Sequence, residues 1–314
     1  MKNLGTALRA MALVALSLGV FVAAVVAAAR LFGWQAGPLY FLVALTPYFG
    51  LAMVIAAVAA LALRVWWLAL PAALIAALVT SWWIPAFRGV PSEQHWDLTV
   101  MTTNLQFGNG DAATVAQAIS DHDVDLLSVQ ELTDQGVANL VAAGISAELP
   151  YRMVRPHEGA AGTGLWSRYP ISDRDETDDL IFENLSVRVA APTGTLTFLA
   201  MHPTPPSLSD GNARALIFDG TRDFIAQTQG PAIAAGDFNA TRDNVPLREL
   251  EAIGFLDAAT AAGAGMVRTW PNDLSPIPPL AALDHVLTRD TPPAASVVIL
   301  EIPNTDHRAV IARL

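Results

Sequence analysis

The stretch that decides the fold is Ile233–Thr241, with the sequence IAAGDFNAT. Its first residues are small and apolar and run into Gly236, a pattern typical of a buried strand that stops at a turn. A glycine at that point lets the backbone approach a neighbour closely, or adopt a conformation closed to other residues. In a strand, Asp237 and Asn239 share one face while Phe238 points into the core. The alternative interpretation is an Asx turn with two capping side chains.

The composition indicates two dissimilar parts. The chain has 314 residues, a mean hydropathy of +0.40, a net charge of −11 and no cysteine. No Asp or Glu precedes Glu93, and the basic residues before it are Lys2, Arg9, Arg30, Arg64 and Arg88. We therefore expect a membrane domain over residues 1–90 and an acidic catalytic domain over residues 91–314. The absence of cysteine excludes disulfides and thiolate metal ligands, and it fits any compartment.

Three apolar runs in the first part are long enough to span a bilayer as helices. They cover residues 11–32, 40–63 and 65–87, with tryptophan and tyrosine residues near their ends, as in an aromatic belt. A cleaved signal peptide is the alternative for the first run, but that run is long and two more follow it. The sequence predicts a multi-pass protein of the cell membrane.

The orientation rests on few charges. Lys2 and Arg9 flank the first run and favour a cytoplasmic N-terminus, and Arg64 would then also lie inside. Arg30 and Arg88 would lie outside and oppose this arrangement. With three spans, the prediction places the catalytic domain outside the cytoplasm.

The remaining residues alternate between strand and helix patterns. Asp111 can cap a helix through residue 119, and a second helix is expected over residues 210–227. Strands are expected over residues 98–103, 126–130, 163–166, 186–190, 196–201, 283–287, 296–300 and 309–312. Residues 271–279 form a proline-rich loop, and Trp270 before it either lines a pocket or only packs. The pattern by itself predicts mixed α and β structure, with packed sheets and helices outside.

Short polar motifs follow several of these strands in a fixed order. They are TTNLQ around Asn104, VQEL around Glu131, GLWSRYPI from Gly164, AMHP around His202, GDFNA around Asp237, LDHVL around Asp284 and TDHRAV around His307. The ordered set resembles the endonuclease/exonuclease/phosphatase superfamily, which has the DNase I-like fold, from about Asp97 to the C-terminus. It resembles in particular a membrane-anchored bacterial branch with three N-terminal spans. The resemblance implies an α/β fold, an α+β four-layer sandwich of two packed mixed β-sheets flanked by helices, after three transmembrane α-helices.

The resemblance also implies metal-dependent phosphoester hydrolysis. Such a reaction needs a hard cation with oxygen ligands, a base for water and fixed donors for the developing charge. The implied cofactor is Mg²⁺ or Mn²⁺, with Glu131 and Asp306 as metal ligands. The implied catalytic residues are Asn104, His202 and Asn239 as donors to phosphate oxygens, Asp237 toward the water, and His307 oriented by Asp284. Whether Asp237 or His307 is the base stays open.

Several of these residues have a plain structural interpretation as well. Glu131 could be an N-terminal carboxylate of the helix that opens at Thr133. His202 could simply end a strand before Pro203. Asp306 and His307 could form a solvated loop pair, and His285 is read as structural.

The charge pattern bears on the substrate. The chain has no lysine after Lys2, and its second part is strongly acidic, whereas nucleic-acid binders carry basic patches. The sequence therefore disfavours nucleic acid and favours a phosphate-bearing substrate, small or lipid-borne, at a membrane lipid bilayer. The alternatives are a membrane-anchored nuclease and a catalytically inactive interaction domain. The oligomeric state stays open.

Overall fold

The computed structural model describes residues 2–176, 182–205 and 211–314. The chain divides into two compact units. The first comprises Met1–Pro85 with Asp243–Val245, and the second comprises Ala86–Arg242 with Pro246–Leu314. Each unit has its own packed apolar interior.

The first unit is helical, with α1 (Lys2–Phe32), α2 (Pro38–Ala44), α3 (Thr46–Ala62) and α4 (Trp66–Arg88). Two stretches, Ala7–Phe32 and Trp66–Arg88, are each long and apolar enough to cross a membrane as a single helix. The run over residues 40–63 was expected to form a further span, and the structure bears this out only if a bent pair of helices counts as one span. It forms α2 and α3, which bend by 70°.

The bend has a local cause. Pro47 lies in the first turn of α3 and has no N–H to donate to the carbonyl of Val43. The hydroxyl of Thr46 donates to that carbonyl instead, at 2.6 Å. The helix therefore restarts at Thr46 rather than continuing from α2. By length and composition, the described residues thus offer two candidate membrane spans, or three if the bent pair counts as one.

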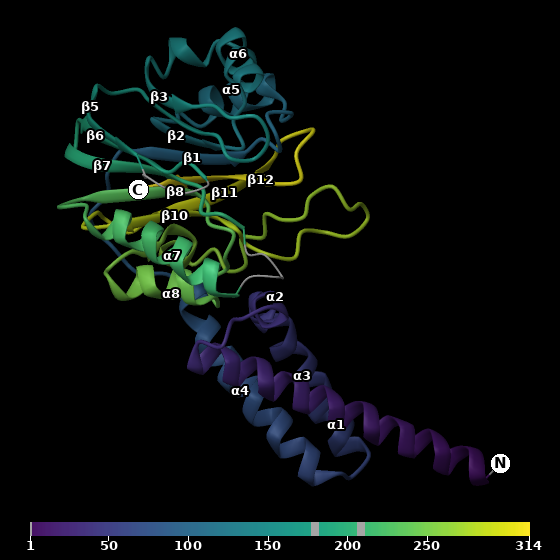
Figure 1. The fold of residues 1–314 in the computed structure, drawn as a ribbon. Coiled ribbons are helices and arrows are strands. Elements are labelled where there is room, and N and C mark those ends of the chain that lie inside the picture. Colours follow the sequence, from purple (N-terminus) through teal and green to yellow (C-terminus); the bar gives the residue numbers. More distant parts are fainter. Residues whose placement is uncertain (1, 177–181, 206–210) are drawn as a thin grey trace. The chain divides into compact units, whose positions relative to one another are not determined.

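The second unit is built on two six-stranded sheets (Figure 1). The first sheet has the order β11-β12-β1-β2-β4-β3 and the second the order β5-β6-β7-β8-β10-β9. Both are mixed, because β1 pairs with β2 and β7 with β8 in parallel, among antiparallel neighbours. The strands are β1 (Thr99–Asn104), β2 (Leu126–Gln130), β3 (Tyr151–Arg155), β4 (Thr163–Ser167), β5 (Ile171–Glu176), β6 (Leu185–Ala191), β7 (Gly194–Met201), β8 (Ala232–Asp237), β9 (Leu256–Asp257), β10 (Asp284–Arg289), β11 (Ser296–Glu301) and β12 (Arg308–Arg313).

Helices cover the outer faces of both sheets. Figure 1 shows α5 and α6 on the side of the first sheet, and α7 and α8 on the side of the second. Their bounds are α5 (Ala112–Asp121), α6 (Asp134–Ala142), η1 (Ile145–Ala147), α7 (Gly211–Ala226), α8 (Val245–Ala252) and α9 (Ala258–Ala261). One apolar core lies between the sheets, and a second lies between the first sheet and α5 and α6. The expected arrangement of two packed mixed sheets flanked by helices is confirmed.

Most of the expected elements are present within a residue or two. The side chain of Asp111 caps α5 by accepting a hydrogen bond from the N–H of Thr114. Strands β3 and β5 were not expected; both are mostly exposed, and β5 carries five charged or polar residues in succession. The expected start of a helix at residue 210 lies outside the described residues, and α7 is described from Gly211.

The pairing of the strands brings the polar motifs to one edge of the sandwich. In the first sheet, Asn104 at the end of β1 pairs with Gln130, directly before Glu131. In the second sheet, β7 and β8 end side by side, and Asp284 at the start of β10 pairs directly with Asp237. The motifs that are distant in sequence thus meet where the two sheets face each other.

Candidate active site

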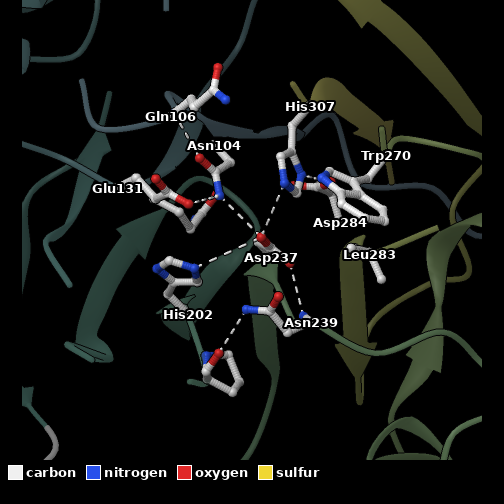
Figure 2. A network of polar contacts seen from close by, with 12 residues as sticks. Asn104, Gln106, Glu131, His202, Asp237, Asn239, Trp270, Leu283, Asp284 and His307 are labelled. Atoms are coloured by element: carbon white, nitrogen blue, oxygen red, sulfur yellow. Dashed lines mark hydrogen bonds and ion pairs between the residues drawn. The ribbon is translucent and has the colours of Figure 1, made fainter. Parts of the chain in front are cut away.

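Asp237 lies at the centre of the polar cluster (Figure 2). Its Oδ2 accepts a hydrogen bond from Asn104 Nδ2 at 3.1 Å. The same oxygen lies 3.6 Å from His307 Nε2 and 3.8 Å from His202 Nε2. Burial raises the pKa of Asp237, whereas the charge of His307 lowers it and that of Asp284 raises it further. The carboxylate is thus enclosed by groups that can donate protons to it or to a bound anion.

Glu131 follows β2 with its backbone in the left-handed region, at φ +52°, a conformation that costs energy in a residue other than glycine. Its Oε1 accepts from Asn104 Nδ2 at 3.1 Å, and its Oε2 accepts from the N–H of Phe107 at 3.0 Å. The cap of α6 is Thr133, which accepts from the N–H of Gly136. Glu131 therefore does not cap the next helix, and its carboxylate is directed toward the cluster.

Asn104 links the two carboxylates, since its amide nitrogen contacts both Glu131 and Asp237. Its own Oδ1 accepts from the N–H of Gln106 at 2.9 Å, which fixes the orientation of the amide. Its backbone carbonyl accepts from the hydroxyl of Thr305 at 2.8 Å. The side chain was expected to donate to phosphate, and in this structure both hydrogen bonds donated by Nδ2 go to carboxylates.

His307 and Asp284 form a buried pair. Nδ1 of His307 lies 2.8 Å from Oδ2 of Asp284, while Nε2 points toward Asp237. Burial by itself lowers the pKa of His307, but the carboxylates of Asp284 and Asp237 outweigh it and raise the pKa to about 10. The ring is therefore an imidazolium at neutral pH, held with one N–H directed at the centre of the cluster.

His202 and Asn239 complete the cluster from the second sheet. Burial lowers the pKa of His202 to about 4, against the opposing charge of Asp237, so this ring is neutral at pH 7. Asn239 has φ +49°, its N–H donates to Oδ1 of Asp237 at 2.8 Å, and its Nδ2 donates to the carbonyl of Pro203 at 3.0 Å. The asparagine thus joins the end of β8 to the segment after β7.

Asp306 lies at the edge of the cluster. Its Oδ2 accepts from the indole Nε1 of Trp270 at 3.0 Å, so Trp270 does line the site. Within the part of the chain that the structure describes, the acidic and histidine groups whose ligand atoms lie within 4.8 Å of one another are Asp237, Asp284 and His307. Glu131 and Asp306 are outside that group, and their assignment as metal ligands stays a prediction.

The carboxylate oxygens of the cluster are ligands of the kind that a hard cation prefers. Mg²⁺ and Mn²⁺ favour oxygen ligands, and the pKa of Glu131 is raised by burial despite its hydrogen bonds, so an adjacent cation would stabilise the charged carboxylate. Oδ1 of Asp284 is buried and has no hydrogen-bond partner among the described residues. Burial lowers the pKa of His307, but the carboxylates of Asp284 and Asp237 raise it to about 10, which favours a contact with a phosphate oxygen.

His285 is a structural member of the site, as the sequence suggested, but its partner was not foreseen. Its Nδ1 lies 2.6 Å from Oδ2 of Asp257, and its Nε2 lies 3.0 Å from the carbonyls of Ala240 and Ala282. Burial would lower the pKa of His285, but Asp257 raises it. Asp257 also caps α9. The histidine therefore ties the chain after Asn239 to the start of β10; only the unusual LDHVL sequence hinted at it.

The fold is a sandwich of two mixed sheets with a cluster of carboxylates, amides and histidines at one edge. Residues 101–307 match the endonuclease/exonuclease/phosphatase family. The chain belongs to this family. A comparison with curated protein sequences found no match.

Solved structures share the fold at low sequence identity. A family protein from Leptotrichia buccalis superposes with a TM-score of 0.53 at 14% identity, covering 69% of this chain and 98% of its own. A humanized D. rerio TDP2 gives 0.55 at 14%, covering 68% and 97%. The 3′ phosphatase NExo from Neisseria, bound to a product DNA hairpin, gives 0.56 at 14%, covering 69% and 99%. These likenesses support the fold of the second unit alone.

Proposed function

We propose that this protein is a membrane-anchored phosphoesterase that depends on Mg²⁺ or Mn²⁺ and acts outside the cytoplasm on a phosphomonoester, a phosphodiester or a lipid-borne phosphate or pyrophosphate. The observation that carries the proposal is the cluster around Asp237, where groups from both sheets meet within hydrogen-bond or ion-pair distance. Membership of the family supports the reaction class. The apolar helices support the anchor.

In the proposed reaction, most of the residues donate hydrogen bonds to the phosphate, and one residue accepts a proton from water. The imidazolium of His307 donates from Nε2 to a phosphate oxygen, and Asp284 keeps it charged and oriented, as a carboxylate does for a catalytic imidazole. Asn104 and Asn239 present amide groups to the same space and can donate to phosphate oxygens once substrate competes with their present partners. His202, neutral and buried, offers one further contact.

The acceptor is Asp237. Its carboxylate lies at the centre of the cluster, and the pKa raised by burial brings it closer to the range in which a base takes a proton from water. This assignment follows from the state of His307: a ring with a pKa near 10 already holds its proton and cannot take another. The water would be held between Asp237 and the phosphorus atom.

Glu131, with Asp306 as a second expected ligand, would hold the divalent cation. When bound, the cation neutralises phosphate charge and favours attack by water. The main-chain N–H of Phe107 and the amide of Asn104 hold the Glu131 carboxylate in place. Since the left-handed backbone at Glu131 costs energy, its retention here fits a functional demand on the direction of this side chain.

The test is a substrate panel on the purified full chain in detergent. It contains p-nitrophenyl phosphate, bis-p-nitrophenyl phosphate, phosphatidic acid in mixed micelles and supercoiled plasmid DNA, each with Mg²⁺, with Mn²⁺ and with EDTA. We expect metal-dependent hydrolysis of at least one of the first three and intact plasmid. Cleavage of the plasmid in preference to the others would indicate the nuclease, and hydrolysis of none would leave the inactive interaction domain.

A further inference from the structure

An exposed apolar loop stands beside the cluster and takes no part in the proposed chemistry. Residues 270–281, with the sequence WPNDLSPIPPLA, contain a single charged residue, Asp273. We call this segment the apolar finger. Leu274 is 51% exposed and Ile277 is 53% exposed, although side chains of this kind are usually covered in a folded protein. Figure 1 shows this yellow-green part of the chain extending beyond the edge of the sheets.

The finger has a defined base rather than being loose chain. Trp270 and Ala281 exchange two backbone hydrogen bonds, at 3.0 and 2.8 Å, and form an isolated antiparallel bridge. At its tip, the N–H of Ile277 donates to the carbonyl of Leu274 at 2.7 Å. The structure thus closes the loop at both ends while its apolar side chains stay uncovered.

The base of the finger is fastened to the catalytic cluster. The indole of Trp270 donates to Asp306, and the N–H of Asn272 donates to the carbonyl of Asp306 at 2.7 Å. Arg308 donates from Nε to Oδ1 of Asn272 at 2.7 Å. Asp306 and Arg308 flank His307 in the sequence. Whatever the finger binds is therefore held directly beside the imidazolium.

A further exposed apolar side chain lies next to Glu131. Phe107 is 52% exposed, and its N–H holds Glu131. An open hollow of about 450 Å³ is lined by Gln106 next to this phenylalanine and by Asn272 and Asp273 of the finger. Exposed apolar side chains thus stand on two segments that are hydrogen-bonded to Asp306 and Glu131, an arrangement suited to a ligand with a phosphate at one end and an apolar body beside it.

We propose that the apolar finger and Phe107 contact a lipid surface and hold the hydrocarbon chain of a lipid-borne phosphate while its headgroup lies against Asp237 and His307. This deepens the proposed function and rests on it for the substrate. Nucleic acid is a poor occupant, because the finger has no basic residue and the chain has no lysine after Lys2. A lipid surface is the natural partner, because the chain carries helices long and apolar enough to cross a membrane.

The contact with lipid can be measured without any substrate, with a fluorophore attached at one position. Because the chain has no cysteine, a single introduced cysteine is labelled specifically. Ile277→Cys carries one environment-sensitive fluorophore (NBD) in the full chain, reconstituted into vesicles of phosphatidylcholine and phosphatidylglycerol. The matched control is Val141→Cys on α6, where the valine is 40% exposed. We expect blue-shifted emission and quenching by spin-labelled lipid at position 277, and quenching by aqueous iodide at position 141. Iodide quenching at both positions without lipid quenching at 277 would overturn the proposal.

The substrate role has its own test. In mixed micelles of phosphatidic acid, Leu274→Asp and Ile277→Asp should raise KM by about tenfold or more at unchanged kcat, as expected for lost ground-state binding. Hydrolysis of p-nitrophenyl phosphate should stay the same, and Val141→Asp should change neither. Equal losses on both substrates, or none, would overturn the substrate role. A wild-type chain that hydrolyses no phosphoester would refute the proposed function, while the fluorophore would still decide whether the finger meets lipid.

Discussion

Replacing Gly236 by alanine tests why the GDFN motif begins with a glycine. A Cβ built on Gly236 would lie 1.8 Å from the carbonyl oxygen of Met201 and 2.7 Å from its carbonyl carbon. Ordinary contact begins at 3.4 Å, so the two paired strands would have to separate by about 1.6 Å in a close-packed interior. The overlap is with the backbone of Met201 on β7, which pairs with β8, and no side-chain rotation can relieve it.

The displacement is expected to lower both the free energy of unfolding and the catalytic rate. Overpacking of this kind costs about 1–3 kcal/mol of unfolding free energy, and each kcal/mol lowers the Tm of a domain of this size by about 2–4 °C. The strand shift also moves His202 and Asp237, which directly follow Met201 and Gly236. A misplacement of about 1 Å in a catalytic group costs about a hundredfold in rate. We therefore expect Gly236→Ala to lose far more activity than its stability loss explains.

The assay pairs thermal unfolding with hydrolysis of p-nitrophenyl phosphate and bis-p-nitrophenyl phosphate. The matched control is Gly144→Ala: this glycine has φ +94° and open space around an added Cβ, so alanine costs about 1–2 kcal/mol from backbone strain alone. Gly144→Ala should lower Tm to a similar degree and keep wild-type kcat. If Gly236→Ala keeps wild-type kcat and Tm, or if both variants lose activity in step with Tm, the reasoning from close approach is refuted.

Three further outcomes are expected. Asp237→Asn should lower kcat by about a hundredfold or more without lowering the unfolding free energy, because burial disfavours the charged carboxylate it removes; a variant with near-normal kcat would exclude Asp237 as the base. His285→Phe should cost about 3–5 kcal/mol of unfolding free energy by leaving Asp257 buried without its partner, and adding Asp257→Asn should restore part of it; no recovery in denaturant melts would contradict the pairing. An alkaline phosphatase fusion after Leu314 should be active and a green fluorescent protein fusion dark; the reverse would place the catalytic unit in the cytoplasm.

The sequence predicted which polar residues cluster at one edge of the sandwich, because they lie at strand ends. Asn104, Glu131 and Asp237 each end or follow a buried apolar strand, and parallel pairing brings such ends together. Phe238 is fully buried, as its alternation with Asp237 predicted. The close approach required of Gly236 is likewise confirmed, although its neighbour, Met201, could not be named from the sequence.

Other features depend on contacts between residues far apart in the chain. His285 and Asp257 pair across a sequence separation of 28 residues, and no sequence motif links the two positions. The break at Leu45 depends on Pro47, whose position in the first turn of a helix is compatible with either a kink or a new start. Strand β5 has charged residues on both faces, so no apolar alternation marks it. The hydrogen bond from Trp270 to Asp306 was not foreseen either, and the role of Asp306 as a metal ligand stays a prediction.

The central claim is that a divalent cation bound through Glu131 drives phosphoester hydrolysis at Asp237. The most direct measurement is calorimetric titration of Mn²⁺ into the EDTA-treated full chain, alongside hydrolysis of bis-p-nitrophenyl phosphate and p-nitrophenyl phosphate, for wild type and Glu131→Gln. Glutamine keeps the shape of the side chain and removes the charge. The account predicts saturable Mn²⁺ binding and restored hydrolysis in wild type, with both weakened by about tenfold or more in the variant. Hydrolysis that persists unchanged in EDTA, or Mn²⁺ binding that is unaffected by Glu131→Gln, would contradict it.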